Sequence, residues 1–96
     1  MAEEFSKFDI VDFLENEEDI TAFLNECFGE YPDEPEFLAH ALGVAARARG
    51  MSSIAKQTGL SRESLYRAFS KKGNPRLDTL LKVTDALGLR LKFSGA

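Results

Sequence analysis

The pattern of apolar and polar positions predicts a chain built mainly from helices. Through much of the sequence, apolar residues recur every three or four positions, which places them on one helix face. Asn16 is a good N-cap ahead of three carboxylates, and Pro35 fits the first turn of a later helix. Three helices are predicted, with these inward faces: Ile20, Phe23, Leu24, Cys27 and Phe28 up to Gly29; Phe37, Leu38, Ala41, Leu42, Ala45 and Ala48 between Asp33 or Glu34 and Gly50; and Leu77, Leu80, Leu81, Ala86 and Leu87 up to Gly88.

Two shorter apolar segments flank these helices. Residues 8–14 are largely apolar and predict one or two helical turns that need a partner surface. Near the C-terminus, Leu89, Leu91 and Phe93 alternate with polar residues, which is the period of a β-strand. An isolated strand leaves its backbone groups unpaired, so we expect it to pair with the same strand of a second copy. A frayed tail, or a strand added to a partner's sheet, is the alternative.

Residues 53–69 predict a helix-turn-helix, two short helices joined by a tight turn. Gly59 can take the positive φ that such a turn needs, and Ser61 can cap the second helix. Ile54 supplies an apolar anchor on the first helix, while Leu65 and Phe69, four residues apart, face the core from the second. The polar side chains of the second helix are then free to meet base edges of DNA.

The expected DNA contacts divide into base and phosphate contacts. Base contacts are assigned to Arg62, Glu63, Ser64 and Arg67, at or near the leading end of the second helix. Glu63 would accept from a cytosine amine, or else orient Arg67 one turn on. Phosphate contacts are assigned to Ser52, Ser53, Lys56, Ser61, Tyr66, Lys71, Lys72, Asn74 and Arg76. A helical hairpin in any small domain would share part of this pattern, so the distribution of charge is needed to decide whether the motif binds DNA.

Charge divides the chain in two. Residues 1–38 contain thirteen acidic residues and one lysine, a net charge of −12, whereas residues 39–96 contain eleven basic and three acidic residues, a net charge of +8. The basic part coincides with the helix-turn-helix, as attraction to phosphates requires. The acidic segment, residues 8–36, cannot bind DNA, so it serves as a spacer, a solubilising segment or a docking surface for a basic partner.

The length of 96 residues predicts one domain, spanning residues 8–96 after a flexible N-terminus at residues 1–7. The expected fold class is all-α, with about five helices and the short C-terminal strand paired across a homodimer. No apolar run is long enough for a membrane span, and the acidic start is unlike a secretory signal. We therefore expect a cytoplasmic protein.

Catalysis and metal binding fit the sequence poorly. Cys27 lies in step with apolar residues on a helix face and is expected to be a buried small hydrophobe. His40 has no second histidine, cysteine or carboxylate pair at ligand spacing. We expect no catalytic residue, no metal site and no cofactor.

The longer combination of motifs resembles the addiction-module antidote proteins, antitoxins of the lambda-repressor-like (XRE) helix-turn-helix superfamily. The resemblance spans about residues 8–93, and its most specific parts are residues 46–51, 59–67 and 73–80, followed by Lys82-Val83 and 86–88. The chain departs from the family pattern at two places. The first helix of the helix-turn-helix is short, which leaves Ser52 as its expected cap, and Arg76 stands where a small capping residue is expected.

The resemblance implies a partner and a mode of action. Such antitoxins accompany a small basic toxin, often of the RelE/ParE-like class, neutralise it by direct contact and repress their shared operon. Two-fold symmetry then predicts an inverted-repeat operator of double-stranded DNA. The composition agrees, because a toxin that holds RNA must be basic and the acidic segment complements it. The alternatives are a stand-alone repressor and a protein-interaction module that does not bind DNA.

Overall fold

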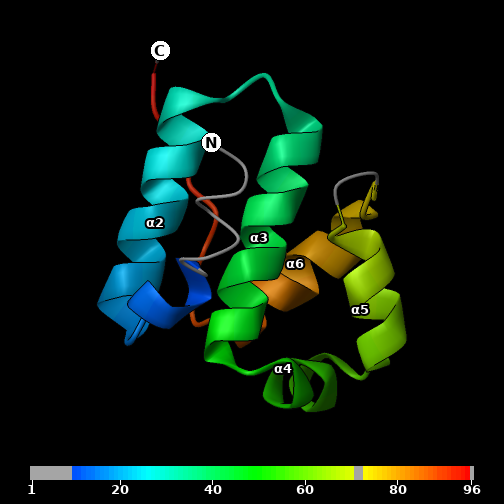
Figure 1. The fold of residues 1–96 in the computed structure, drawn as a ribbon. Helices are drawn as coiled ribbons and strands as arrows, with labels where there is room; N and C mark the ends of the chain where they lie inside the picture. The colour runs from blue at the N-terminus through cyan, green and yellow to red at the C-terminus, as the bar shows by residue number, and fades with distance from the viewer. Residues whose placement is uncertain (1–9, 71–72, 96) are drawn as a thin grey trace.

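The computed structural model describes residues 10–70 and 73–95, and within these ranges the chain is helical (Figure 1). A short 3-10 helix, η1 (Ile10–Phe13), precedes five α-helices. These are α2 (Glu17–Glu30), α3 (Pro35–Arg49), α4 (Met51–Thr58), α5 (Arg62–Ala68) and α6 (Leu77–Ala86). The predicted flexible segment 1–7, Phe8, Lys71 and Lys72 lie outside the described residues. The all-α prediction with five helices is confirmed.

Local capping explains where the first two long helices begin and end. The Asn16 side chain accepts a hydrogen bond from the Asp19 N–H at 2.8 Å, which confirms the predicted N-cap of α2. The helix passes Gly29 and ends one residue later, at Glu30. Helix α3 begins at Pro35, as predicted, and Gly50 ends it with a φ of 112°, which favours glycine.

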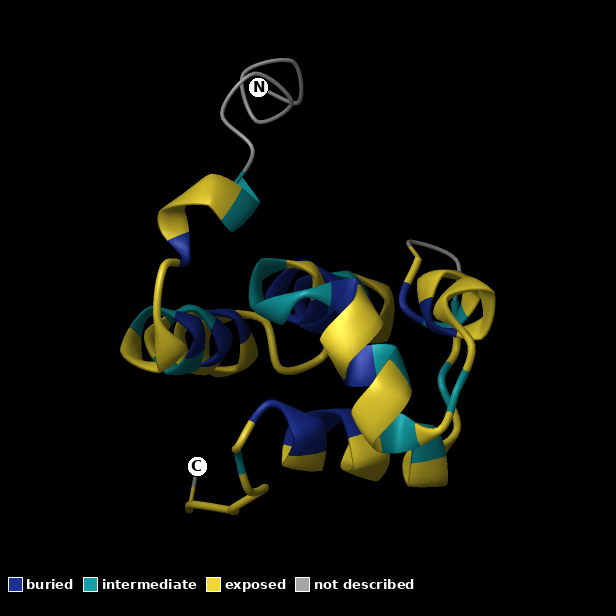
Figure 2. Ribbon diagram, turned by 90° about the horizontal axis from the view of Figure 1, so that it is seen from below, coloured by how far each residue is buried: buried dark blue, intermediate teal, exposed yellow. Residues whose placement is uncertain are grey.

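The helices close around one core. Figure 1 shows α2 and α3 side by side as a hairpin, with α4 at the end of α3 away from the α2–α3 connection. Helix α6 packs on α4, and the buried faces point inward in Figure 2. Ile54 and Leu65 are fully buried, so the two anchors predicted for the helix-turn-helix are confirmed. Buried with them are Leu14, Ile20, Leu24, Cys27, Ala41, Leu42, Val44, Ala45, Ala46, Met51, Phe69, Val83, Ala86 and Leu87.

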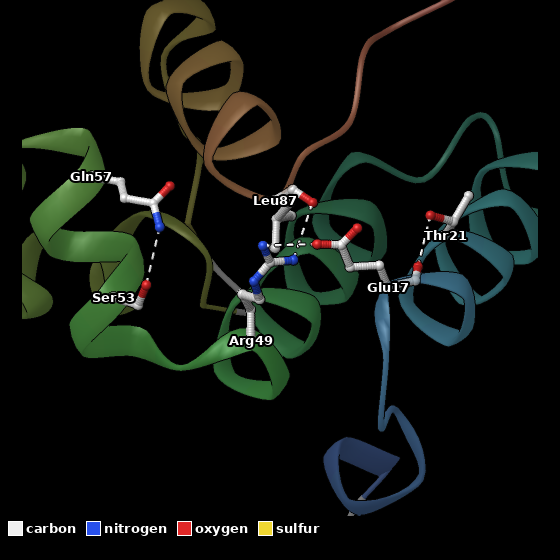
Figure 3. A network of polar contacts seen from close by, with 6 residues as sticks. All are labelled: Glu17, Thr21, Arg49, Ser53, Gln57 and Leu87. Carbon is white, nitrogen blue, oxygen red and sulfur yellow. Dashed lines mark hydrogen bonds and ion pairs between the residues drawn. The ribbon is translucent and has the colours of Figure 1, made fainter.

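Two features of α3 bind distant parts of the chain to the core. A Cβ placed on Gly43 would lie 2.8 Å from the Phe69 carbonyl oxygen, so only glycine allows α3 to approach the end of α5 this closely. The Arg49 guanidinium pairs with the Glu17 carboxylate at 3.0 Å and donates a hydrogen bond to the Leu87 carbonyl at 3.5 Å (Figure 3). Arg49 therefore connects the end of α3 with the start of α2 and the end of α6.

Several apolar positions do not lie where the sequence predicted. Leu77 is 70% exposed and Leu81 is exposed as well, because α6 packs on α4 through the neighbouring stripe of Leu80, Val83 and Leu87. Phe28 near the end of α2 and Phe37 near the start of α3 are also partly exposed, although both were predicted on inward faces.

The predicted C-terminal strand is wrong for the described chain. Residues 89–95 form no strand, because the helical domain offers no sheet edge with which they could pair. Leu91 and Phe93 are exposed, whereas Leu89 is partly buried against the core. In the ranges that the structure describes, no helix has the length and apolarity needed to cross a membrane.

Candidate nucleic-acid interface

Helices α4 and α5 form two short arms joined by a tight turn at residues 59–61. Gly59 has a φ of 76°, which confirms the predicted left-handed turn, and its N–H donates to the Ala55 carbonyl at 2.9 Å. The Thr58 hydroxyl donates to the Ile54 carbonyl at 2.8 Å and accepts from the Leu60 N–H at 3.2 Å. This hydroxyl fixes the turn by a contact that the sequence reading missed.

Ser61 caps α5 as predicted. Its hydroxyl oxygen accepts from the Ser64 N–H at 3.0 Å, and its hydroxyl donates to the Ser64 oxygen at 2.8 Å. The Ser64 hydroxyl therefore accepts one hydrogen bond within the cap and keeps its own proton to donate. The first turn of α5 is held rigidly, with Arg62 and Glu63 next to the cap.

The two faces of α5 differ sharply. Leu65 and the C-cap residue Phe69 are buried in the core, whereas Arg62, Glu63 and Arg67 are exposed. The ion pairs among the described residues do not include Glu63 with Arg67, so the structure does not contain the orienting contact considered for Glu63. The four expected base-reading residues thus lie on one short helix, and neither Arg62 nor Arg67 forms an ion pair with another described residue.

The expected phosphate-binding residues of α4 surround its exposed side. Ser52, Ser53 and Lys56 are exposed, and the Ser53 hydroxyl accepts from the Gln57 amide at 3.1 Å (Figure 3). The predicted cap at Ser52 is wrong, since α4 begins one residue earlier, at Met51. Gly50 takes the N-cap position with a φ of 112° and no side-chain cap, which shortens the connection to α3.

The loop before α6 contributes Asn74 and Arg76, both exposed. Arg76 is the N-cap residue of α6 and forms no side-chain cap bond, as expected for a residue in place of a small cap. Its guanidinium pairs instead with Asp78 at 3.3 Å. The hydrogen bonds from Arg76 and from the Thr79 N–H, in that order, lower the pKa of the Asp78 carboxyl. The charge of Arg76 is therefore shared with a carboxylate.

Arg47 is a cation that the sequence reading did not assign to this surface. It projects from α3 into an open hollow between α4 and α5, whose other lining residues include Ser52, Arg62 and Tyr66. The sequence signal that could have found it is its place in the last turn of α3, three residues before Gly50. Arg47 thus adds a third helix to the candidate interface.

Metal binding and the environment of Cys27 can be compared with the sequence predictions. In the described ranges, no group of three or more histidine, cysteine or acidic side chains is placed to hold a metal ion. The thiol of Cys27 is buried in the core, as predicted, and its pKa is raised first by burial and then by the nearby Glu26 carboxylate. Cys27 is therefore a packing residue of α2.

Comparison with known proteins adds two matches. A family described as "Probable addiction module antidote protein" matches residues 4–95. A protein of Haemophilus influenzae, described as "Uncharacterized protein", is 46% identical over 92 residues, which cover 96% of this chain and 93% of that protein. No solved structure matches the chain.

Proposed function

The chain belongs to the family of probable addiction module antidote proteins, and from this premise we propose that it is a sequence-specific DNA-binding antitoxin that represses its own operon. In this proposal it also neutralises a small basic toxin by direct contact. An antidote of an addiction module implies a cognate toxin as its partner. DNA binding, repression and the mode of neutralisation are argued from the surfaces of this molecule.

One observation carries the DNA-binding part of the proposal: α5 exposes two arginines that form no ion pair with another described residue, while its other face is buried in the core. Arg62 and Arg67 would enter the major groove and donate to guanine O6 and N7. Glu63 would accept from a cytosine amine, and Ser64 would donate one short contact. This assignment follows the resemblance of the sequence motifs to the lambda-repressor-like (XRE) superfamily, in which the second helix of the motif reads the bases.

The phosphate contacts would come from the helices around α5. Ser52, Ser53 and Lys56 on α4 lie beside the reading helix, and Arg47 extends this cationic surface from α3. Ser61, Tyr66, Asn74, Arg76, Lys71 and Lys72 complete the proposed set, the two lysines outside the described residues. These contacts would determine the orientation of the protein on DNA and the salt dependence of binding, while the arginines of α5 would determine which base sequence is bound.

Binding as a homodimer would double the reading surface and require an inverted-repeat operator with half-sites about 34 Å apart, or a multiple of that distance. The exposed leucines Leu77 and Leu81 lie one turn apart on α6, and Leu91 and Phe93 add exposed apolar surface in the tail. These apolar side chains support association of two copies. Light scattering on the wild type and on Leu77→Glu/Leu81→Glu tests it, because a wild type of monomeric mass refutes the dimer.

The decisive experiment for DNA binding is footprinting of the region upstream of the gene at ~150 mM salt, where non-specific binding is weak. We expect one protected inverted repeat, and an Arg62→Ala/Arg67→Ala variant that no longer protects it. Absence of any protected site would refute the DNA-binding proposal and favour a protein-interaction module.

Neutralisation is tested separately with the product of the adjacent gene. The proposal requires that product to be a small basic protein, of RelE/ParE-like class, whose growth inhibition is relieved by this chain. Basic character fits a toxin that holds RNA, and the acidic segment 8–36 would raise the rate of encounter. A chain that binds the operator but relieves no inhibition would instead be a stand-alone repressor.

A further inference from the structure

An aromatic pair is exposed where α2 turns into α3. The Tyr31 and Phe37 rings meet edge to face, with centroids 4.9 Å apart. Although the rings touch, Tyr31 remains 47% exposed and Phe37 38% exposed. Two adjoining aromatic side chains that both remain this exposed to solvent form an apolar platform. Aromatic residues are enriched at the centres of protein interfaces.

Carboxylates surround this platform. An open hollow of about 500 Å³ beside Phe37 is lined by Glu34, Pro35, Glu36, Phe37 and His40. Asp33 lies in the same turn, and none of Asp33, Glu34 and Glu36 forms an ion pair with another described residue. We call Tyr31, Asp33, Glu34, Glu36 and Phe37 the turn surface.

Two carboxylates next to the turn surface lie where they destabilise helix α2. Glu26 and Glu30 lie toward the C-terminal end of α2, whose last turn contains no basic residue. A helix C-terminus carries partial negative charge, so carboxylates there are unfavourable. No lysine or arginine occurs in the sequence from Phe8 to Ala46 to offset them. A cation supplied from outside the chain would relieve this repulsion.

We propose that the turn surface is the site at which this chain holds the toxin, by taking an arginine or lysine side chain over the aromatic pair and between the carboxylates. A cation on an aromatic face is attracted by the negative charge of the ring face, and neighbouring carboxylates pair with it directly. This inference rests on the proposed neutralisation of a basic toxin, and it narrows the docking region from residues 8–36 to the end of one helical hairpin.

The turn surface lies at the opposite end of α3 from Arg62 and the leading turn of α5, which border Gly50 and Met51, whereas the C-terminal end of α5 reaches Gly43 in the middle of α3. Figure 1 shows the α2–α3 connection at one end of α3 and α4 at the other. The 15 residues of α3 span roughly 22 Å at 1.5 Å per residue. Substitutions in the turn surface should therefore weaken toxin binding and leave operator binding unchanged.

The aromatic pair could also serve only to hold the turn. Tyr31 accepts a backbone hydrogen bond from Glu34 at 3.3 Å, so the rings cover a closed turn. A purely structural role predicts that loss of a ring lowers the melting temperature and weakens operator and toxin binding together. A docking role predicts that toxin binding alone is lost, and that Phe37→Tyr, which keeps a ring, restores it.

The experiment measures the affinity of the full-length chain for the purified product of the adjacent gene by surface plasmon resonance, with operator binding and melting temperature recorded for each variant. Phe37→Ala should weaken toxin binding by about tenfold or more, as expected for an aromatic at an interface centre. Phe13→Ala is the matched control, since Phe13 is a 62% exposed phenylalanine of the same acidic segment, and it should bind as wild type.

Charge is tested with Glu34→Gln/Glu36→Gln against the equally large change Glu15→Gln/Glu18→Gln at the start of α2. The first pair should lower the association rate and its salt dependence by severalfold more than the second. Wild-type affinity in both Phe37→Ala and Glu34→Gln/Glu36→Gln would overturn the turn surface as the docking site. A wild-type chain that does not bind the adjacent gene product would refute the neutralisation proposal, and this inference with it.

Discussion

Replacing Gly43 by alanine should destabilise the protein even though alanine is the better helix former. Gly43 lies in the middle of α3, where the change would ordinarily stabilise by about 1 kcal/mol. Here the new Cβ would lie 2.8 Å from the Phe69 carbonyl oxygen and 3.1 Å from the Phe69 Cβ. Neither atom is the flexible end of a side chain, so the substitution must push the end of α5 away from α3.

The expected size follows from these distances. Ordinary contact begins near 3.4 Å, so the oxygen must retreat by about 0.6 Å, while the Phe69 N–H is bonded to the Leu65 carbonyl at 3.1 Å. Overpacking of this kind costs about 1–3 kcal/mol, most of which is not offset by the gain in helix propensity. Subtracting the gain of about 1 kcal/mol leaves a net loss of up to about 2 kcal/mol, so the melting temperature should fall by up to about 15 °C.

Gly29→Ala is the matched control for this prediction. Gly29 lies in α2, and a Cβ placed on it meets nothing within 4 Å. The same chemical change should therefore raise the melting temperature by a few degrees. Circular dichroism on wild type and both variants measures the two shifts. A Gly43→Ala melting temperature at or above that of the wild type would show that α5 is not held against α3 in this way.

Three further outcomes follow from the structure. Arg67→Ala should lose about 1–3 kcal/mol of discrimination at one operator base pair, whereas Lys56→Ala should weaken binding to operator and random DNA alike. Competition assays with both DNAs measure these losses. Equal losses of affinity for operator and random DNA in Arg67→Ala would contradict base reading by Arg67. Ser61→Ala removes the cap of α5 and should lower the free energy of unfolding by about 1 kcal/mol in urea denaturation, an unchanged midpoint being the contrary result. Because burial raises the pKa of the Cys27 thiol, alkylation of the native chain at pH 8 should be much slower than in denaturant, and equal rates would show that Cys27 is accessible.

The parts of the fold that the sequence predicted are those set by neighbours along the chain. The caps at Asn16 and Ser61 and the left-handed turn at Gly59 depend on residues within three positions of each other. Helix periodicity likewise identified Ile54 and Leu65 as buried. The exposure of Arg62, Glu63 and Arg67 on α5 followed from the burial of Leu65, because the side of a helix on which one residue lies determines where its neighbours point.

Contacts between distant segments could not be predicted in this way. Gly43 reads as a weak point in a helix until Phe69, 26 residues later, is seen against it. Nothing in the neighbouring sequence indicates that Arg49 pairs with Glu17 and donates to the Leu87 carbonyl, 38 residues away. Arg47 joined the candidate interface only when the fold placed α3 beside the start of α4. Each depends on how the helices pack, which periodicity along one helix does not specify.

The C-terminal tail shows why an alternating pattern failed where helical patterns succeeded. A helix satisfies its backbone groups within its own segment, so periodicity and caps are enough to predict it. A strand needs a second strand, and alternation at Leu89, Leu91 and Phe93 specifies two faces without supplying that partner. In the described chain the Leu89 N–H therefore returns to the Thr84 carbonyl at 2.9 Å, continuing the end of α6, and the apolar side chains beyond it remain exposed. Whether a sequence pattern predicts an element thus depends on whether the hydrogen-bond partners of that element lie in the same segment.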